Sequence, residues 1–299
     1  MAGNKTITGK NKPAAVLLAI TAIRNNKISD EWADALESRM DKSRIDSFKS
    51  ITRELTVKET AWQKLIESKL NKWNSFRDSL AIPFQNIVLH DTIYVLLGYL
   101  GNDDGFTFRR QTVCLDLTAL QNAYGDANLP ENDNRVDRIY AHEYTHLLHK
   151  EWALKNKYEP STFKDSILWE CLYEGIGMYR SLNPKWLPVN GTLPTITTST
   201  LEDLCAVFTE RLIIIESGTT FTEEEKVMLQ ANLSRGQVNK KWGAFPVAIW
   251  LSLEAEGKDE NLIYWINKGP EAVIHLAAKY LSGKNRETLQ AAFKTILSR

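Results

Sequence analysis

Apolar residues recur at three- and four-residue intervals over most of the chain, the spacing of one face of a helix. The pattern is clear from Pro13 to Leu80, where Lys and Glu separate the apolar positions. It returns in the last third, where we expect helices over residues 201–217, 223–233, 244–256, 261–266 and 270–281. A Thr-rich stretch before them, residues 191–200, is expected to be irregular. The pattern therefore predicts a mostly helical protein.

The pattern changes between residues 83 and 117. Ile, Val, Leu and Tyr are enriched at 86–90 and 92–99, and the sequence GNDDG at 101–105 is typical of a turn. Two more strands are expected, at 106–110 and 111–117. The fold class predicted is therefore α+β, mostly helical, with one small mixed sheet. It divides into an N-terminal helical lobe (1–82), a core (83–182) and a C-terminal helical lobe (183–299).

Two helices are expected in the second half of the predicted core. A loop rich in Gly, Pro, Asn and Asp, residues 124–134, precedes a helical pattern from Arg135 to Ala153, and its last polar residues are expected to cap that helix. The second helix is expected from Phe163 to Leu182, ending before Pro184.

The first of these helices contains the sequence HEYTH, in which His142 and His146 are four residues apart. On a helix both imidazoles project from one face and can bind a single ion. Glu143 is rotated from His142 by about 100°, so it can reach a water bound to that ion without displacing either histidine. A catalytic zinc site has three protein ligands and one open position. The motif predicts one Zn²⁺ per chain, with a third ligand from elsewhere.

His149 is the nearest further histidine, but it lies about 10 Å along the helix axis from His142. It cannot bind the same ion unless the helix breaks, and we expect it to pack in the core or to support a ligand rather than to bind the ion itself. On the second helix Glu170 and Glu174 share a face, so periodicity alone does not choose between them. Cys171 is a third donor on that helix, although a buried cysteine is more often structural.

HEYTH followed by YEGIGMY at residues 173–179 resembles the gluzincin metallopeptidases, in particular a group of bacterial predicted zinc-dependent proteases. The resemblance covers about residues 86–182 and implies zinc held by His142, His146 and Glu174, with Glu143 as the general base in peptide-bond hydrolysis. It also implies a small sheet beside the motif helix. Gly177 stands where such families usually have Ala.

The glycines beside Glu174, Gly175 and Gly177, favour it as the ligand because they allow the two helices to approach closely. The resemblance also suggests that strand 111–117 pairs with a peptide by edge addition, and a packed inner strand is the equal alternative. The family's downstream catalytic Tyr or His is not located in this sequence. The candidates for stabilising the oxyanion are Tyr179, Arg180, Arg235, Lys240 and Lys241.

Composition limits the other functions. Lys plus Arg and Asp plus Glu balance at 37 each, which argues against nucleic-acid binding, and the apolar run 14–20 is too short to span a membrane. That run follows Lys5, Lys10 and Lys12 and is expected to form a first helix rather than a secretory signal. Three widely spaced cysteines favour a reducing, cytoplasmic compartment over secretion.

Two other classes of function compete with a peptidase acting on peptides or proteins. One is an inactive metallopeptidase-like module that binds zinc, although an intact Glu143 argues against it. The other is a metal-free helical interaction protein in which the motif arose by chance. Metal content separates the last class from the others, and peptide cleavage separates the first two.

Overall fold

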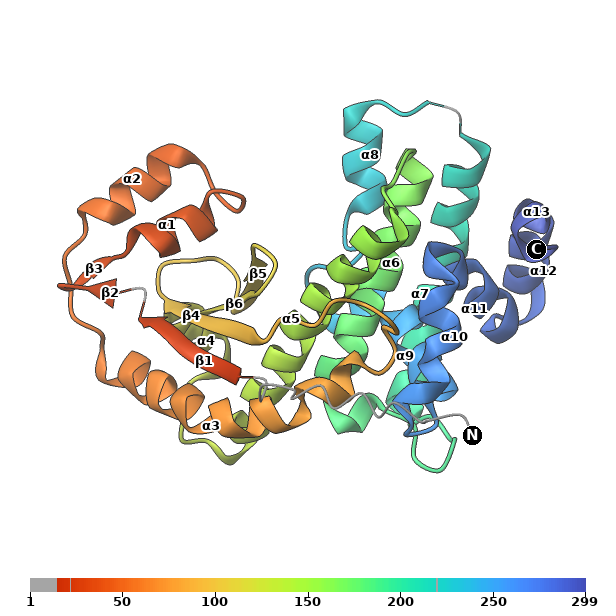
Figure 1. Ribbon diagram of the computed structural model, residues 1–299. Coiled ribbons are helices and arrows are strands. Elements are labelled where there is room, and N and C mark those ends of the chain that lie inside the picture. The colour runs from red at the N-terminus through yellow and green to blue at the C-terminus, as the bar shows by residue number, and fades with distance from the viewer. Residues whose placement is uncertain (1–14, 22, 219) are drawn as a thin grey trace, which may run out of the picture. The chain divides into compact units, whose positions relative to one another are not determined.

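The structure is a computed structural model that describes residues 15–21, 23–218 and 220–299, the first of these ranges by its backbone alone. The chain forms two compact units. One contains the residues up to Phe76 and 88–129, and the other contains 77–87 and 130–299. The first carries the sheet and the second is helical (Figure 1). The predicted fold class, α+β and mostly helical with a small mixed sheet, is confirmed.

The sheet has four strands in the order β1-β4-β6-β5. β1 (Ala15–Thr21) pairs in parallel with β4 (Thr92–Gly98), β4 pairs in parallel with β6 (Thr112–Asp116), and β5 (Gly105–Phe108) is antiparallel to β6. Both edges of β6 are therefore hydrogen-bonded within the sheet, and its five residues are buried. β6 is a packed inner strand, so it is not available for edge addition.

The helix expected from Pro13 is wrong, because β1, β2 (Ile23–Arg24) and β3 (Lys27–Ile28) precede the first helix. An unbroken apolar run fits a strand that is covered on both faces of the sheet as well as a helix, and periodicity does not separate the two. Pairing of β1 with β4 brings the start of the chain into the sheet, so the two compact units do not follow the predicted boundary at residue 82. Lys5, Lys10 and Lys12 lie outside the described residues.

Helices cover both faces of this sheet (Figure 1). α1 (Asp30–Leu36) and α2 (Lys42–Ser50) lie on one face; α4 (Leu117–Tyr124) and the part of α3 (Val57–Ala81) that belongs to this unit lie on the other. The expected strand 86–90 is wrong, because this segment is a largely exposed loop that pairs with no strand.

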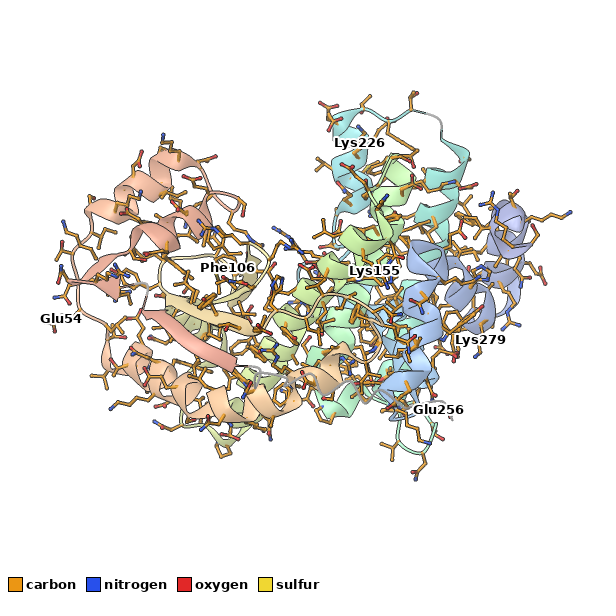
Figure 2. The ribbon with its side chains drawn as sticks, in the orientation of Figure 1. Glu54, Phe106, Lys155, Lys226, Glu256 and Lys279 are labelled. Atoms are coloured by element: carbon orange, nitrogen blue, oxygen red, sulfur yellow. The ribbon has the colours of Figure 1, made fainter. Side chains whose placement is uncertain are left out.

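Trp32 fixes α1 to the sheet. Its indole Nε1 donates a hydrogen bond to the Tyr99 carbonyl at 2.9 Å, and a Cβ on Gly98 would lie only 2.1 Å from its ring. Phe106 of β5, labelled in Figure 2, packs against the same ring with centroids 5.5 Å apart. A glycine in β4 therefore lets a large aromatic residue of α1 lie directly on the strand.

The helical unit is built around three helices, α5 (Pro130–Asn156), α6 (Phe163–Ser181) and α9 (Ala244–Ala255). α6 packs against both of the others. Exposed charged side chains such as Lys279 and Glu256 lie along its outside (Figure 2). The remaining elements are η1 (Pro184–Trp186), α7 (Thr195–Ser217), α8 (Glu223–Gln230), η2 (Val238–Lys240), η3 (Asp259–Leu262), α10 (Ile263–Asn267), η4 (Gly269–Glu271), α11 (Ala272–Tyr280), α12 (Gly283–Ala292) and α13 (Lys294–Leu297).

Two helix starts differ from those predicted. α5 begins at Pro130, so the polar residues that were expected to cap it lie inside its first turns; proline suits the first helical position because its missing N–H needs no partner there. α7 begins at Thr195, inside the stretch expected to be irregular. Among the described residues, no helix is both long and apolar enough to cross a membrane.

Candidate metal centre

α5 brings the three residues of the motif together. The Nε2 atoms of His142 and His146 lie 2.9 Å apart, and the two rings meet edge to face with centroids 4.5 Å apart. Glu143 Oε1 lies 4.0 Å from His142 Nε2. Each of these residues offers a donor atom within 4.8 Å of the other two. His142, Glu143 and His146 can therefore hold a metal ion.

α6 adds Glu174 to this group. Its Oε1 lies 3.6 Å from His146 Nε2, and its Oε2 lies 3.7 Å from His142 Nε2. The same carboxylate thus faces both imidazoles, whereas Glu143 lies close to His142 on the motif helix itself. Three residues of α5 and one of α6 therefore lie close together.

The charges of these groups suit a cation. Burial would raise the pKa of Glu174, but the neighbouring His146 and His142 hold it at about 2. Burial and the nearby His142 hold the pKa of His146 well below its ordinary value. Against the effect of burial, its contact with Glu174 and the charge of Glu143 raise the pKa of His142. At neutral pH Glu174 is a carboxylate and His146 has a neutral ring able to donate a lone pair.

Gly177 allows α6 to approach the histidines. A Cβ at this position would lie 2.9 Å from Cε1 of His146 and 3.1 Å from Cε1 of His142. Gly175 faces the other way, because a Cβ there would lie 2.5 Å from the side chain of Val247 on α9. The two glycines therefore serve different interfaces, and only Gly177 lies against the candidate metal centre.

Each histidine has a further contact with α6. The Nδ1 of His142 lies 3.1 Å from the hydroxyl of Ser181, and the ring of His146 stacks on Tyr173 with centroids 4.0 Å apart. Sequence reasoning did not select either residue. Ser181 follows Glu174 by seven residues, two helical turns, and this spacing was the available signal.

Glu170 and Cys171 do not contact the histidines directly. Glu170 accepts a hydrogen bond from the Ser234 hydroxyl at 2.8 Å. The Cys171 sulfur is fully buried and lies 2.8 Å from the position that a Cβ on Gly243 would take. Cys171 therefore packs against the start of α9, and burial raises the pKa of its thiol well above the ordinary value.

His149 has the packing role that was expected. Its ring is fully buried among aromatic side chains and lies 4.5 Å from Trp169 and 5.4 Å from Phe84. Burial lowers its pKa to about 3, so the ring is neutral in this environment.

The positively charged side chains that were candidates for stabilising the oxyanion differ in which groups their charges act on. The charge of Lys241 lowers the pKa values of both His142 and Glu174. Arg180 instead pairs with Asp259 at 2.7 Å. The charge of Arg235 acts on Glu170. Lys241 is thus the candidate with the clearest link to the centre.

No family model matches this chain, and neither a curated protein nor a solved structure matches it.

Proposed function

We propose that this protein is a zinc-dependent peptidase that hydrolyses peptide bonds with a metal-activated water. The observation that carries the proposal is the convergence of two imidazoles and one carboxylate. The two Nε2 atoms lie 2.9 Å apart, Glu174 Oε1 lies 3.6 Å from His146 Nε2, and Glu174 Oε2 lies 3.7 Å from His142 Nε2. Tetrahedral zinc with bonds of about 2.0 to 2.2 Å requires its ligand atoms to lie about 3.3 to 3.6 Å apart. The observed distances bracket that range, so the residues present fit the ion.

The donor set also fits a catalytic rather than a structural zinc. Two imidazoles and one carboxylate are the ligands of several zinc hydrolases, and they leave the fourth position for water. When bound, zinc would polarise the scissile carbonyl and lower the pKa of the water to about 7. In this proposal His142, His146 and Glu174 hold the ion, and Glu143 stays out of its coordination.

Glu143 is the general base in this proposal. Glu143 is 8% exposed, and its Oε1 lies 4.0 Å from Nε2 of His142. From that place it accepts the proton of the attacking water and then delivers it to the leaving amine. The single carboxylate serves both proton transfers, so no second acid is required.

Lys241 is the proposed donor to the oxyanion. Its carbonyl accepts the hydrogen bond of Phe245 N at 3.1 Å, which forms the first turn at the start of α9. That start packs on α6 beside Glu174, because the Ala244 carbonyl lies 3.6 Å from the position of a Cβ on Gly175. The charge of Lys241 acts on His142 and Glu174, so an ammonium at this position can also stabilise negative charge on a substrate oxygen.

The experiment that tests the proposal combines metal analysis of the purified full chain with cleavage of a peptide library, before and after removal of the metal by a chelator. We expect one zinc per chain and cleavage that disappears on chelation and returns with zinc. Zinc without cleavage would point to an inactive zinc-binding module. Well under one equivalent of zinc after reconstitution would point to a metal-free protein and overturn the proposal.

A further inference from the structure

His142 is hydrogen-bonded on the side of its ring that faces away from Glu174. Its Nδ1 lies 3.1 Å from the Ser181 hydroxyl, and that hydroxyl donates its single proton to the Met178 carbonyl at 3.2 Å. A hydroxyl has one proton to donate and two lone pairs to accept with. Because the proton is directed at Met178, the Ser181 oxygen is left to accept a hydrogen bond from His142.

We propose that Ser181 is a positioning residue that fixes the tautomer of His142, with the proton on Nδ1 and the lone pair on Nε2. The inference rests on the metal centre of the proposed function. The lone pair then lies at the atom that is 2.9 Å from His146 Nε2 and 3.7 Å from Glu174. Without Ser181 the proton can occupy Nε2, and a protonated Nε2 cannot bind a metal ion.

The two histidines are held in different ways. Among the described residues, Nδ1 of His146 is buried without a hydrogen-bond partner. Its ring lies flat on Tyr173, with centroids 4.0 Å apart and planes within 8°. Stacking fixes the plane of a ring but not the position of its proton. Of the two Nδ1 atoms, only that of His142 therefore has a hydrogen-bond partner among the described residues, so the loss of Ser181 should act on His142 selectively.

One helix supplies these contacts along a single face. Glu174, Gly177 and Ser181 are spaced by three and four residues on α6, which is the spacing of residues that share a helix face. Glu174 contacts both Nε2 atoms, Gly177 lies against both rings, and Ser181 reaches the outer nitrogen of His142. A bond to the outer nitrogen orients a ligating histidine and increases its basicity.

The first test is zinc affinity in the full chain with three variants. Ser181→Ala should weaken binding by about 10- to 100-fold, the usual cost of removing a partner of a ligating histidine. Ser181→Thr keeps the hydroxyl and should restore most of the affinity. Ser166→Ala is the matched control, because Ser166 lies on the same helix, is also half-buried and bonds to the Thr162 carbonyl at 3.1 Å. It should bind zinc as tightly as the parent.

The second test reads the tautomer directly from the ring nitrogen shifts of His142. It uses ¹⁵N-histidine-labelled, metal-free full-length protein at alkaline pH, with circular dichroism confirming that each sample is folded. The parent and Ser166→Ala should have the proton on Nδ1, and Ser181→Ala should move it to Nε2 in part or completely. An Nε2 proton in the parent, or an unchanged tautomer in Ser181→Ala, would overturn the inference.

The two tests separate this inference from the proposed function. A parent that binds zinc and cleaves peptides while Ser181→Ala keeps both tautomer and affinity would contradict the role of Ser181 alone. A parent that binds no zinc would contradict the metal centre and, with it, the role of Ser181 toward a metal.

Discussion

A Cβ on Gly177 would lie 2.9 Å from Cε1 of His146, closer than side chains approach in folded proteins. It would also lie 3.1 Å from Cε1 of His142, so both imidazoles would have to move. The absence of a side chain at this one position therefore sets how closely α6 can approach the candidate metal centre.

Gly177→Ala should weaken zinc binding by about tenfold or more, because the added methyl group would displace the two imidazoles that hold the ion. Gly175→Ala is the comparison, since its Cβ would instead meet Val247 at 2.5 Å and disturb the packing of α6 on α9. We expect Gly175→Ala to lower the free energy of unfolding more and zinc affinity less. Thermal unfolding and zinc titration of both variants measure the difference. Equal zinc affinities in parent and Gly177→Ala would contradict this account of the glycine.

The third ligand can be identified with three single variants. Glu174→Ala should lose far more zinc affinity than Glu170→Ala or Cys171→Ser, because only Glu174 faces both imidazoles. Glu170 bonds to Ser234, and Cys171 is buried against the start of α9. The measurement is competitive zinc titration of each full-length variant. If Glu170→Ala loses affinity while Glu174→Ala does not, the assignment is reversed.

Removal of the Lys241 charge should reduce turnover without loss of zinc. Lys241→Met should lower kcat by about 100- to 1000-fold, the usual cost of removing an oxyanion donor. Zinc affinity should stay the same or rise, because one positive charge near His142 and Glu174 is gone. Lys240→Met, at the neighbouring position in η2, is the matched control and should retain activity. Comparable kcat values for the two variants would remove Lys241 from the mechanism.

In the sheet-containing unit, stability should depend on pH through Glu59. Its carboxylate is 2% exposed and accepts hydrogen bonds from Arg53 at 2.7 and 2.8 Å and from the Thr118 hydroxyl at 2.6 Å. Burial alone would raise the pKa of Glu59, but these partners lower it from 4.5 to about 2. Because its pKa is lower in the folded state, the Glu59 carboxylate stabilises the fold above about pH 4.5. That contribution is lost as the pH falls toward 2.

Glu59→Gln should therefore lower the free energy of unfolding by about 1 to 3 kcal/mol at neutral pH. The difference from the parent should shrink between pH 4.5 and 2. Glu67→Gln, an exposed position on the same helix, is the control and should leave stability nearly unchanged. Chemical denaturation at several pH values tests this, and a Glu59→Gln effect that grows with acidity would show that the sign is wrong.

The sequence predicted the helix of the motif because its apolar residues repeat regularly on either side of His142 and His146. Helix spacing also placed Glu174 and Glu170 on one face, but it could not choose between them. That choice depends on the packing of α5 against α6, in which Glu174 faces the histidines and Glu170 bonds to Ser234. Which face of a helix meets which neighbour is a tertiary property that periodicity alone does not contain.

The start of the chain was predicted wrongly for a different reason. Residues 15–20 form an unbroken apolar run, and such a run fits either a helix or a strand that is covered on both faces of its sheet. The parallel pairing with β4 decides for the strand, and it joins residues far apart in the sequence, such as Ala15 and Thr92. Ser181 was missed because its spacing from Glu174 shows only a shared helix face, and its contact with His142 depends on how α5 packs against α6.

The central claim, hydrolysis by a zinc-activated water with Glu143 as the base, is tested most directly by kcat of zinc-loaded Glu143→Gln against the parent at equal zinc content. In this account Glu143 is not one of the three ligands, so the variant should keep the fold and one zinc per chain. Its kcat should fall by at least about 100-fold, since proton transfer by a positioned side chain contributes that much or more. A zinc-loaded Glu143→Gln that cleaves peptides at the rate of the parent would contradict the account.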